Sequence, residues 1–338
     1  MQADWKADLR AAVAPFESPH KLLGACQIVT SLGLYLAALG AMYWSLHVSI
    51  FLTCLLAFPT AAFLVRVFIV QHDCGHGSFF SSQRSNDVLG SICGILTLAP
   101  YMLWRRQHAA HHANWNNLDR RDSGTDIYTV CLTVGEYRAL KPWQRFFYRL
   151  PRHPVFAYFV IPPLVFLILY RFPFDAPKSW KRERRAVLLT NMAALAFWSG
   201  LAWTFGIPAV LTVQFSIILL SSAAGFWLFS VQHRFEHARW MRQSVWSFHE
   251  AALSGSSFLA IHPILHWLTG NIGFHHIHHL SPRVPNYRLA ACHKSNPILH
   301  PATSLSLSRA LAGSNLVLWD EAEQKLVRFR DVAHAGVG

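Results

Sequence analysis

Eight histidines gather in three short clusters, and their type and spacing could support chemistry. The clusters read H-D-C-G-H, H-A-A-H-H and H-H-I-H-H in chain order. They contain His72 and His76, then His108, His111 and His112, then His275, His278 and His279. Neutral imidazole is the commonest nitrogen ligand of metals in proteins, at a distance of about 2.0–2.1 Å. The clusters therefore predict a metal centre.

The spacing inside the clusters supplies more imidazoles than one metal ion needs. Residues three or four positions apart share one face of a helix. His111 and His112 are neighbours about 100° apart around a helix, as are His278 and His279, so each pair can serve two adjacent ions. The pattern predicts a dinuclear centre. The ligand type alone admits iron, copper or zinc.

The histidines outside these clusters are more typical of surface or core positions, because a lone histidine is usually structural. They include His20, His47, His153, His249, His262, His293, His300 and His334. The six cysteines lack a C-x-x-C spacing and fit a reduced cytoplasmic setting, so we do not expect them to be ligands.

The elements that must position the clusters are hydrophobic. Hydrophobic residues form 53% of the chain and charged residues 14%, a balance that favours a membrane protein. Four apolar stretches are long enough to cross a hydrocarbon core of about 30 Å: residues 22–45, 49–70, 187–205 and 208–231. Short connections pair them into two hairpins.

Two shorter apolar stretches, 88–104 and 155–170, are expected to be interfacial or re-entrant. We find no internal repeat, and we expect the tail from about residue 304 to form a soluble helix and a short extended segment. The sequence thus predicts an all-α integral membrane protein, one domain over residues 1–338, with a cytosolic cap that carries the histidine clusters.

The basic residues predict the orientation in the membrane, because cytoplasmic loops collect Lys and Arg. The two hairpin connections contain none, and Arg66 alone lies inside a predicted span. The side that holds both termini and the histidine clusters is therefore expected to face the cytoplasm. The net charge of +13 is explained by lipid headgroups rather than nucleic acid. A docking surface for an acidic electron donor is a second interpretation.

Four segments carry a resemblance to a known family. They are Q-H-D-C-G-H from Gln71, H-A-A-H-H-A-N from His108, V-Q-H-R-F-E-H from Val231 and G-N-I-G-F-H-H-I-H-H-L-S-P-R-V-P-N-Y from Gly270. Over roughly residues 70–290 the chain resembles the membrane fatty-acid desaturases, and it is most similar to acyl-lipid desaturases of the Δ12/ω6 type.

This resemblance implies an enzyme with two iron ions that uses O2 to remove two hydrogens from an acyl chain and leave a cis double bond. It implies nine iron ligands: His72, His76, His108, His111, His112, His233, His275, His278 and His279. His237 and His276 are expected to be structural or to support the ligands, and the role of His266 stays open.

Electrons are expected from a separate ferredoxin or cytochrome. No His-Pro-Gly-Gly haem module is present, since Ile264 follows His262 and Pro263. The amino terminus lacks a signal or transit pattern, which favours a bacterial inner membrane.

Ligand imidazoles normally donate their second N–H to a carboxylate or carbonyl group. The acids that are candidates for this orienting role are Asp73, Asp119, Asp122, Asp126 and Glu236. Asn271 is interpreted as a turn or cap residue beside Gly270, outside the site.

Two alternatives stay open. A hydroxylase or ketolase could use the same scaffold, although the H-D-C-G-H box and the long last segment favour a desaturase. A non-enzymatic membrane haem protein would need histidines inside its spans, and haem takes only one or two axial ligands. The clusters here lie outside the predicted spans and include triplets.

Overall fold

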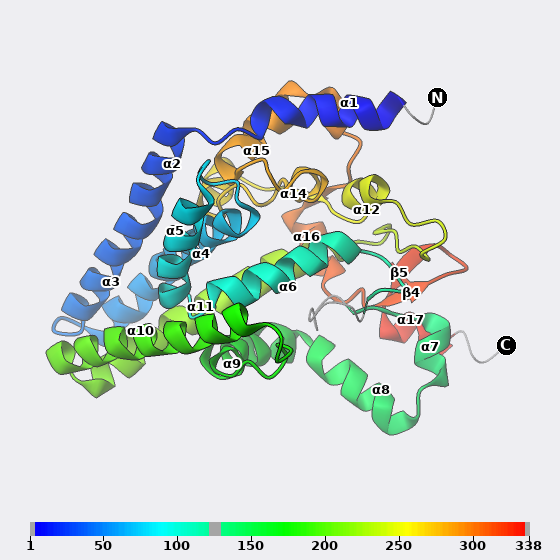
Figure 1. Cartoon of the computed structure of the whole chain (residues 1–338). Coiled ribbons are helices and arrows are strands. Elements are labelled where there is room, and N and C mark those ends of the chain that lie inside the picture. The colour runs from blue at the N-terminus through cyan, green and yellow to red at the C-terminus, as the bar shows by residue number, and fades with distance from the viewer. Residues whose placement is uncertain (1–3, 122–129, 335–338) are drawn as a thin grey trace.

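The computed structural model describes residues 4–121 and 130–334 (Figure 1). Within this part of the chain, four helical rods are long and apolar enough to cross a membrane. The first joins α2 (Lys21–Ile28), η2 (Val29–Gly33) and α3 (Leu34–Ser45). The others are α4 (Ile50–His76), α10 (Lys181–Phe205) and α11 (Ile207–Val231). A helical rod long and apolar enough to cross a membrane thus lies at each of the four predicted spans, as expected for the predicted fold.

The spans form the two predicted hairpins, which project from one end of the molecule in Figure 1. Gly206 turns the second hairpin at φ 85°, a backbone conformation that glycine adopts without steric cost. The hairpins pack through Tyr35 and Met42 of α3, Val67 of α4 and Ile217 of α11. Apolar side chains also cover the outside, as expected for a surface that faces lipid.

Helix α4 is longer than the predicted span, which ended at residue 70. It continues through the first histidine cluster and ends where Gly77 adopts a left-handed φ of 69°. The helix stays buried there because protein, rather than lipid, surrounds its last turns. Gln71, for example, accepts from the Thr97 hydroxyl at 2.6 Å and donates to the Ala99 carbonyl at 3.2 Å.

Each of the two predicted interfacial stretches belongs to a pair of helical segments with a bend between them. Residues 88–104 fall on α5 (Gln83–Leu96) and α6 (Tyr101–Asn114), which meet at an angle of 103°. Residues 155–170 fall on η4 (Phe156–Val160), α9 (Ile161–Leu167) and η5 (Leu169–Arg171). Before them lie α7 (Val134–Ala139), α8 (Pro142–Arg149) and η3 (Leu150–Arg152). If both bent pairs crossed the membrane there would be six spans, so the orientation expected from the basic residues stays a prediction.

The remaining elements form the cap, at the opposite end from the hairpin tips in Figure 1. Its helical elements are α1 (Asp4–Val13), η1 (Ala14–Phe16), α12 (Phe248–Ser254), α13 (Pro263–Leu268), α14 (His275–Leu280), α15 (Asn286–Ser295), η6 (Pro297–Leu299), α16 (Leu307–Gly313) and α17 (Phe329–His334).

The cap also contains short strands: β1 (Leu132–Thr133), β2 (Phe258–Ala260), β3 (Ser304–Ser306), β4 (Leu318–Asp320) and β5 (Lys325–Val327). β4 pairs in parallel with β1 and antiparallel with β5, and β2 pairs in parallel with β3. The tail therefore holds strands and two helices where one helix and one extended segment were predicted. These strand pairs join segments of the cap that are far apart in the sequence. Helices dominate the fold, as predicted.

Candidate metal centre

Helix ends bring all nine predicted ligands together. The last turns of α4 carry His72 and His76, the second half of α6 carries the H-A-A-H-H cluster, and α14 carries the H-H-I-H-H cluster. His233 lies two residues beyond the end of α11. Spans α4 and α11 therefore deliver ligands directly, and α6 and α14 complete the set.

The first group of histidines contains five side chains whose nitrogen atoms lie within 4.8 Å of one another: His72, His76, His108, His112 and His278. The Nε2 atom of His108 lies 3.0 Å from Nε2 of His72 and 3.1 Å from Nε2 of His112. Nε2 of His112 is in turn 3.0 Å from Nε2 of His278. Nitrogen atoms of predicted ligands on three separate helices thus lie close together.

The second group contains His111, His233 and His279, with nitrogen atoms again within 4.8 Å. His275 adjoins it, because its Nε2 lies 2.9 Å from Nε2 of His233 and its ring centroid lies 4.6 Å from that of His279. Each pair of adjacent histidines is split between the groups: His111 and His279 face one, and His112 and His278 face the other. The helix geometry predicted that each adjacent pair could serve two metal ions, and the two histidine groups are arranged in a way that could hold them.

The residues present fit two metal ions. Two nitrogen ligands of one metal at 2.0–2.1 Å stand about 2.9–3.4 Å apart for octahedral to tetrahedral geometry, and the four Nε2 pairs lie 2.9–3.1 Å apart. Within the described residues, Nε2 of His76 and of His279 are buried without a hydrogen-bond partner. Buried polar atoms in this state need an explanation, and a metal ion supplies it.

Burial also keeps these imidazoles in the form that binds metal. It lowers the pKa of His278 and His279 well below the usual histidine value, and the neighbouring imidazoles add to the effect. The same cause lowers the pKa of His233. The neutral ring retains the lone pair that a metal ion requires.

Among the candidate acids, Asp73 is the one that contacts a predicted ligand within the described residues. It is buried, and its Oδ1 lies 3.0 Å from Nδ1 of His72. Its Oδ2 accepts from the backbone N–H of Asn286 at 2.6 Å and from the Asn286 amide at 2.7 Å. Gln27 of α2 donates to Oδ1 of Asn286 at 2.8 Å. This chain of contacts fixes the carboxylate, and the carboxylate fixes the His72 ring.

The other predicted acids do not take this role within the described residues. Asp119 accepts from Arg242 and from the backbone N–H of Gln243. Glu236 is exposed, and Asp122 and Asp126 lie outside the described residues. Asn271 has a φ of 57° and donates to the Asn286 carbonyl, so it holds a turn as predicted.

The non-ligand histidines point elsewhere. His276 is buried against Phe258 and His293, with ring centroids 6.2 Å and 5.3 Å away. His266 stacks on Phe274 at 4.8 Å. His237 is exposed on the surface of the cap. They belong to neither histidine group.

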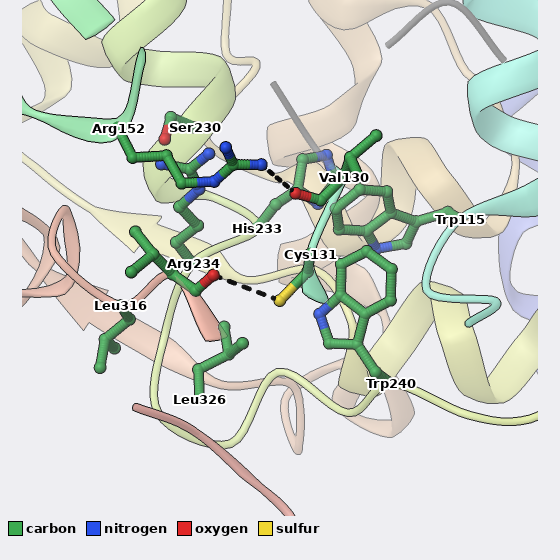
Figure 2. Close-up of a pocket in the computed structure, with 11 residues that line it drawn as sticks. Trp115, Val130, Cys131, Arg152, Ser230, His233, Arg234, Trp240, Leu316 and Leu326 are labelled. Carbon is green, nitrogen blue, oxygen red and sulfur yellow. Dashed lines mark hydrogen bonds between the residues drawn. The ribbon is translucent and has the colours of Figure 1, made fainter. Parts of the chain in front are cut away.

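Trp115 packs against His233 of the second histidine group. Its ring centroid lies 3.8 Å from that of His233. The Gly255 carbonyl accepts from Trp115 Nε1 at 2.9 Å and lies 3.3 Å from Nδ1 of His233. Figure 2 shows Trp115 beside Trp240 at a small cavity of about 20 Å³, which Arg152 also lines. That cavity has room for about one water molecule, so it is too small for a substrate.

Sequence reasoning missed Trp115, Gln27 and Asn286. Asn286 does lie in the R-V-P-N-Y end of the last quoted segment, which was the available signal. No spacing rule marks Gln27, because tertiary packing brings it to Asn286 over 259 residues of chain.

A larger cavity of about 320 Å³ ends at the histidines. It runs between α4, α9 and α11, and its walls are mostly apolar, including Leu64, Phe166 and Phe226. Its lining also contains four ligand candidates: His72, His108, His111 and His275. A polar pair lies beside His108, where Gln107 donates to Asp175 at 2.7 Å. The cavity thus offers an apolar molecule access to both histidine groups.

The chain is similar to several known proteins. The family model for fatty acid desaturases matches residues 44–302. A fatty acid desaturase of Bacillus subtilis is 40% identical over 329 residues, which covers 97% of this chain and 92% of the relative. A probable fatty acid desaturase of Sorghum bicolor is 29% identical and covers 86% and 75%. The sn-1 acyl-lipid omega-3 desaturase (ferredoxin) of Synechocystis is 31% identical and covers 69% and 64%. The chain belongs to the fatty acid desaturase family.

Proposed function

We propose that this membrane desaturase introduces a cis double bond into the acyl chain of a lipid, using O2 and two iron ions held by the nine histidines. The observation that carries the proposal is the apolar cavity whose lining includes histidines of both groups. Such a cavity suits a long hydrocarbon and holds its methylenes against the metal centre in the absence of bulk water.

Iron is inferred from chemistry and family together. Desaturation is an oxidation, and Zn²⁺ has no redox chemistry, so an all-histidine centre for this reaction needs a redox-active metal. Membership of the desaturase family supports iron over copper. When bound, the irons supply the activation of O2 and the oxidising power for the reaction.

The overall reaction balances as follows. Two adjacent methylenes lose one hydrogen atom each, and the carbon–carbon single bond becomes a double bond. O2 accepts those two hydrogens together with two electrons and two protons from outside, and it leaves as two water molecules. The electrons require a one-electron carrier. Relatives are described as using ferredoxin or cytochrome b5, and we propose a separate carrier of this kind here.

The protein's own part is positioning. The apolar side chains of Leu64, Phe166 and Phe226 exclude water from the cavity in which the acyl chain would lie. The polar pair of Gln107 and Asp175 is suited to the ester end of the lipid, whereas the apolar end between α4 and α11 is suited to the methyl end. The Asp73 carboxylate holds a proton of His72 at Nδ1 and so leaves Nε2 free for the metal.

We also propose that the histidines lie on the cytoplasmic side of a bacterial inner membrane. The hairpin tips lack Lys and Arg, and basic residues are frequent where α10 begins, as in Lys181, Arg182 and Arg185. This side is where a soluble electron carrier would bind.

Product analysis tests the function. The full chain is expressed in a bacterial host that makes few unsaturated fatty acids, and total fatty-acid methyl esters are compared by gas chromatography and mass spectrometry. His233→Ala is the inactive variant and exposed His237→Ala, four residues away, is its matched control. A new unsaturated acid with wild type and His237→Ala, absent with His233→Ala, supports the proposal. Hydroxylated or keto products would replace it with the oxygenase alternative.

A further inference from the structure

Helix α11 forms one wall along the length of the large cavity. Ile218, Ser222, Gly225, Phe229 and Gln232 line the cavity at intervals of three or four residues. Ile218 and Gln232 are 14 positions apart, which is about 21 Å along a helix that rises 1.5 Å per residue. This face of α11 therefore follows the cavity from the metal centre toward the middle of the membrane.

Gly225 is the one residue without a side chain on this wall. It lies eight positions before His233, about 12 Å along the helix axis. A Cβ atom added there would meet no atom within 4 Å, so open space lies in front of it. Its neighbours on the wall, Phe226 and Phe229, are bulky. The cavity lining therefore has open space at Gly225 between larger side chains.

Neither backbone strain nor helix packing accounts for this glycine. Its φ is not in the left-handed region. Packing does account for Gly94 of α5, where an added Cβ would lie 2.6 Å from the Ala99 carbonyl oxygen. Glycine inside a helix costs about 0.5–1 kcal/mol relative to alanine. Gly200 also has open space around it, but Gly225 is the one of the two that lines the cavity.

We propose that Gly225 determines how long an acyl chain the enzyme accepts on the methyl side of the new double bond. This inference rests on the proposed function, with the ester end near Gln107 and Asp175. The methyl end of the substrate then passes Gly225 on its way toward Leu64 and Ile218. An added Cβ has open space there, so a larger side chain at this position would extend into that path.

The test compares Gly225→Leu with Gly200→Leu in the full-length, membrane-inserted protein. Gly200 is a matched control because it also lies inside a spanning helix with open space around it, but it is exposed on the outer surface and does not line the cavity. Product formation is measured for lipids that share a head group and differ in acyl length by two methylenes. In parallel, the rise in melting temperature of the purified protein on adding each lipid reports binding.

With Gly225→Leu, the ratio of longer to shorter product is expected to fall by at least about 10-fold, the lower end of the discrimination that a pocket achieves for a single methylene. Gly200→Leu is expected to leave the ratio unchanged. The melting-temperature rise caused by the longer lipid is expected to disappear only in Gly225→Leu. Equal ratios and equal temperature shifts for both variants would overturn the inference.

Two further outcomes are also decisive. If Gly225→Leu does not fold, the smaller Gly225→Ala replaces it: a partial fall in the ratio supports the inference, and no change overturns it. If the wild type makes no unsaturated product, the proposed function fails. The melting-temperature series then still shows whether Gly225 limits the length of a bound acyl chain.

Discussion

The contact between Asp73 and His72 makes a prediction that can be worked out from the structure. Asp73→Asn keeps the shape of the side chain and removes its charge. The carboxylate faces three donors, which are Nδ1 of His72, the Asn286 backbone N–H and the Asn286 amide. The new amide has one oxygen and one NH2 group, so at least one donor must face another donor.

Two estimates of the effect agree. A hydrogen bond to a charged group contributes about 1.5–3 kcal/mol. Removal of the partner that orients a metal ligand typically weakens metal binding by about 10–100-fold, which is about 1.4–2.7 kcal/mol. We therefore expect Asp73→Asn to weaken iron binding at the first histidine group by about 10–100-fold, while the second group is affected less.

The assay is a competition between the purified protein and a soluble Fe²⁺ chelator, with thermal unfolding of the metal-free protein as a check on folding. Asp119→Asn is the control. Like Asp73, Asp119 accepts a hydrogen bond from a backbone N–H, and it also accepts one from Arg242, but it contacts no predicted ligand. Wild-type iron affinity in Asp73→Asn, or equal losses in both variants, would refute the orienting role of Asp73.

Three further outcomes are expected. Gly90→Ala places a methyl group against the ring of Tyr101, and thermal or denaturant unfolding should report a loss of about 1–3 kcal/mol. Burial lowers the pKa of His276 from 6.5 to about 3. Neutral His276 thus stabilises the metal-free fold above about pH 6.5, and this contribution is lost as pH falls toward about 3. The melting temperature of His276→Asn should fall less steeply over that range than that of the wild type. Trp115→Phe removes a donor to the Gly255 carbonyl, and unfolding measurements should report a loss of about 0.5–1.5 kcal/mol.

The histidine sites were predictable because their chemistry is local. Helical spacing alone separates His111 from His112 and His278 from His279, and the structure assigns one of each pair to each group. The spans were predictable for a similar reason, since an apolar stretch of span length has few alternatives to a membrane helix. His233 required the family resemblance, because a single histidine carries no spacing signal.

What could not be predicted depends on tertiary packing. Helix α4 continues to His76 because Thr97 and Ala99 form hydrogen bonds with the buried side chain of Gln71. A hydropathy profile does not contain these tertiary contacts. The 103° bend between α5 and α6 also has no counterpart in a single apolar stretch. Among the candidate acids, Asp73 is held beside His72 by a hydrogen bond from Asn286, which lies more than 200 residues away in the chain.

The central claim is that nine histidines hold two irons in two adjacent groups. The most direct measurement is the number of iron ions bound per chain after anaerobic loading with Fe²⁺ and removal of loose metal, for the wild type, His278→Ala, His279→Ala and His237→Ala. We predict two irons in the wild type and in His237→Ala, and fewer in each of the other two variants. A folded wild type that holds a single iron, or a His237→Ala variant that loses as much as the ligand variants, would contradict the claim.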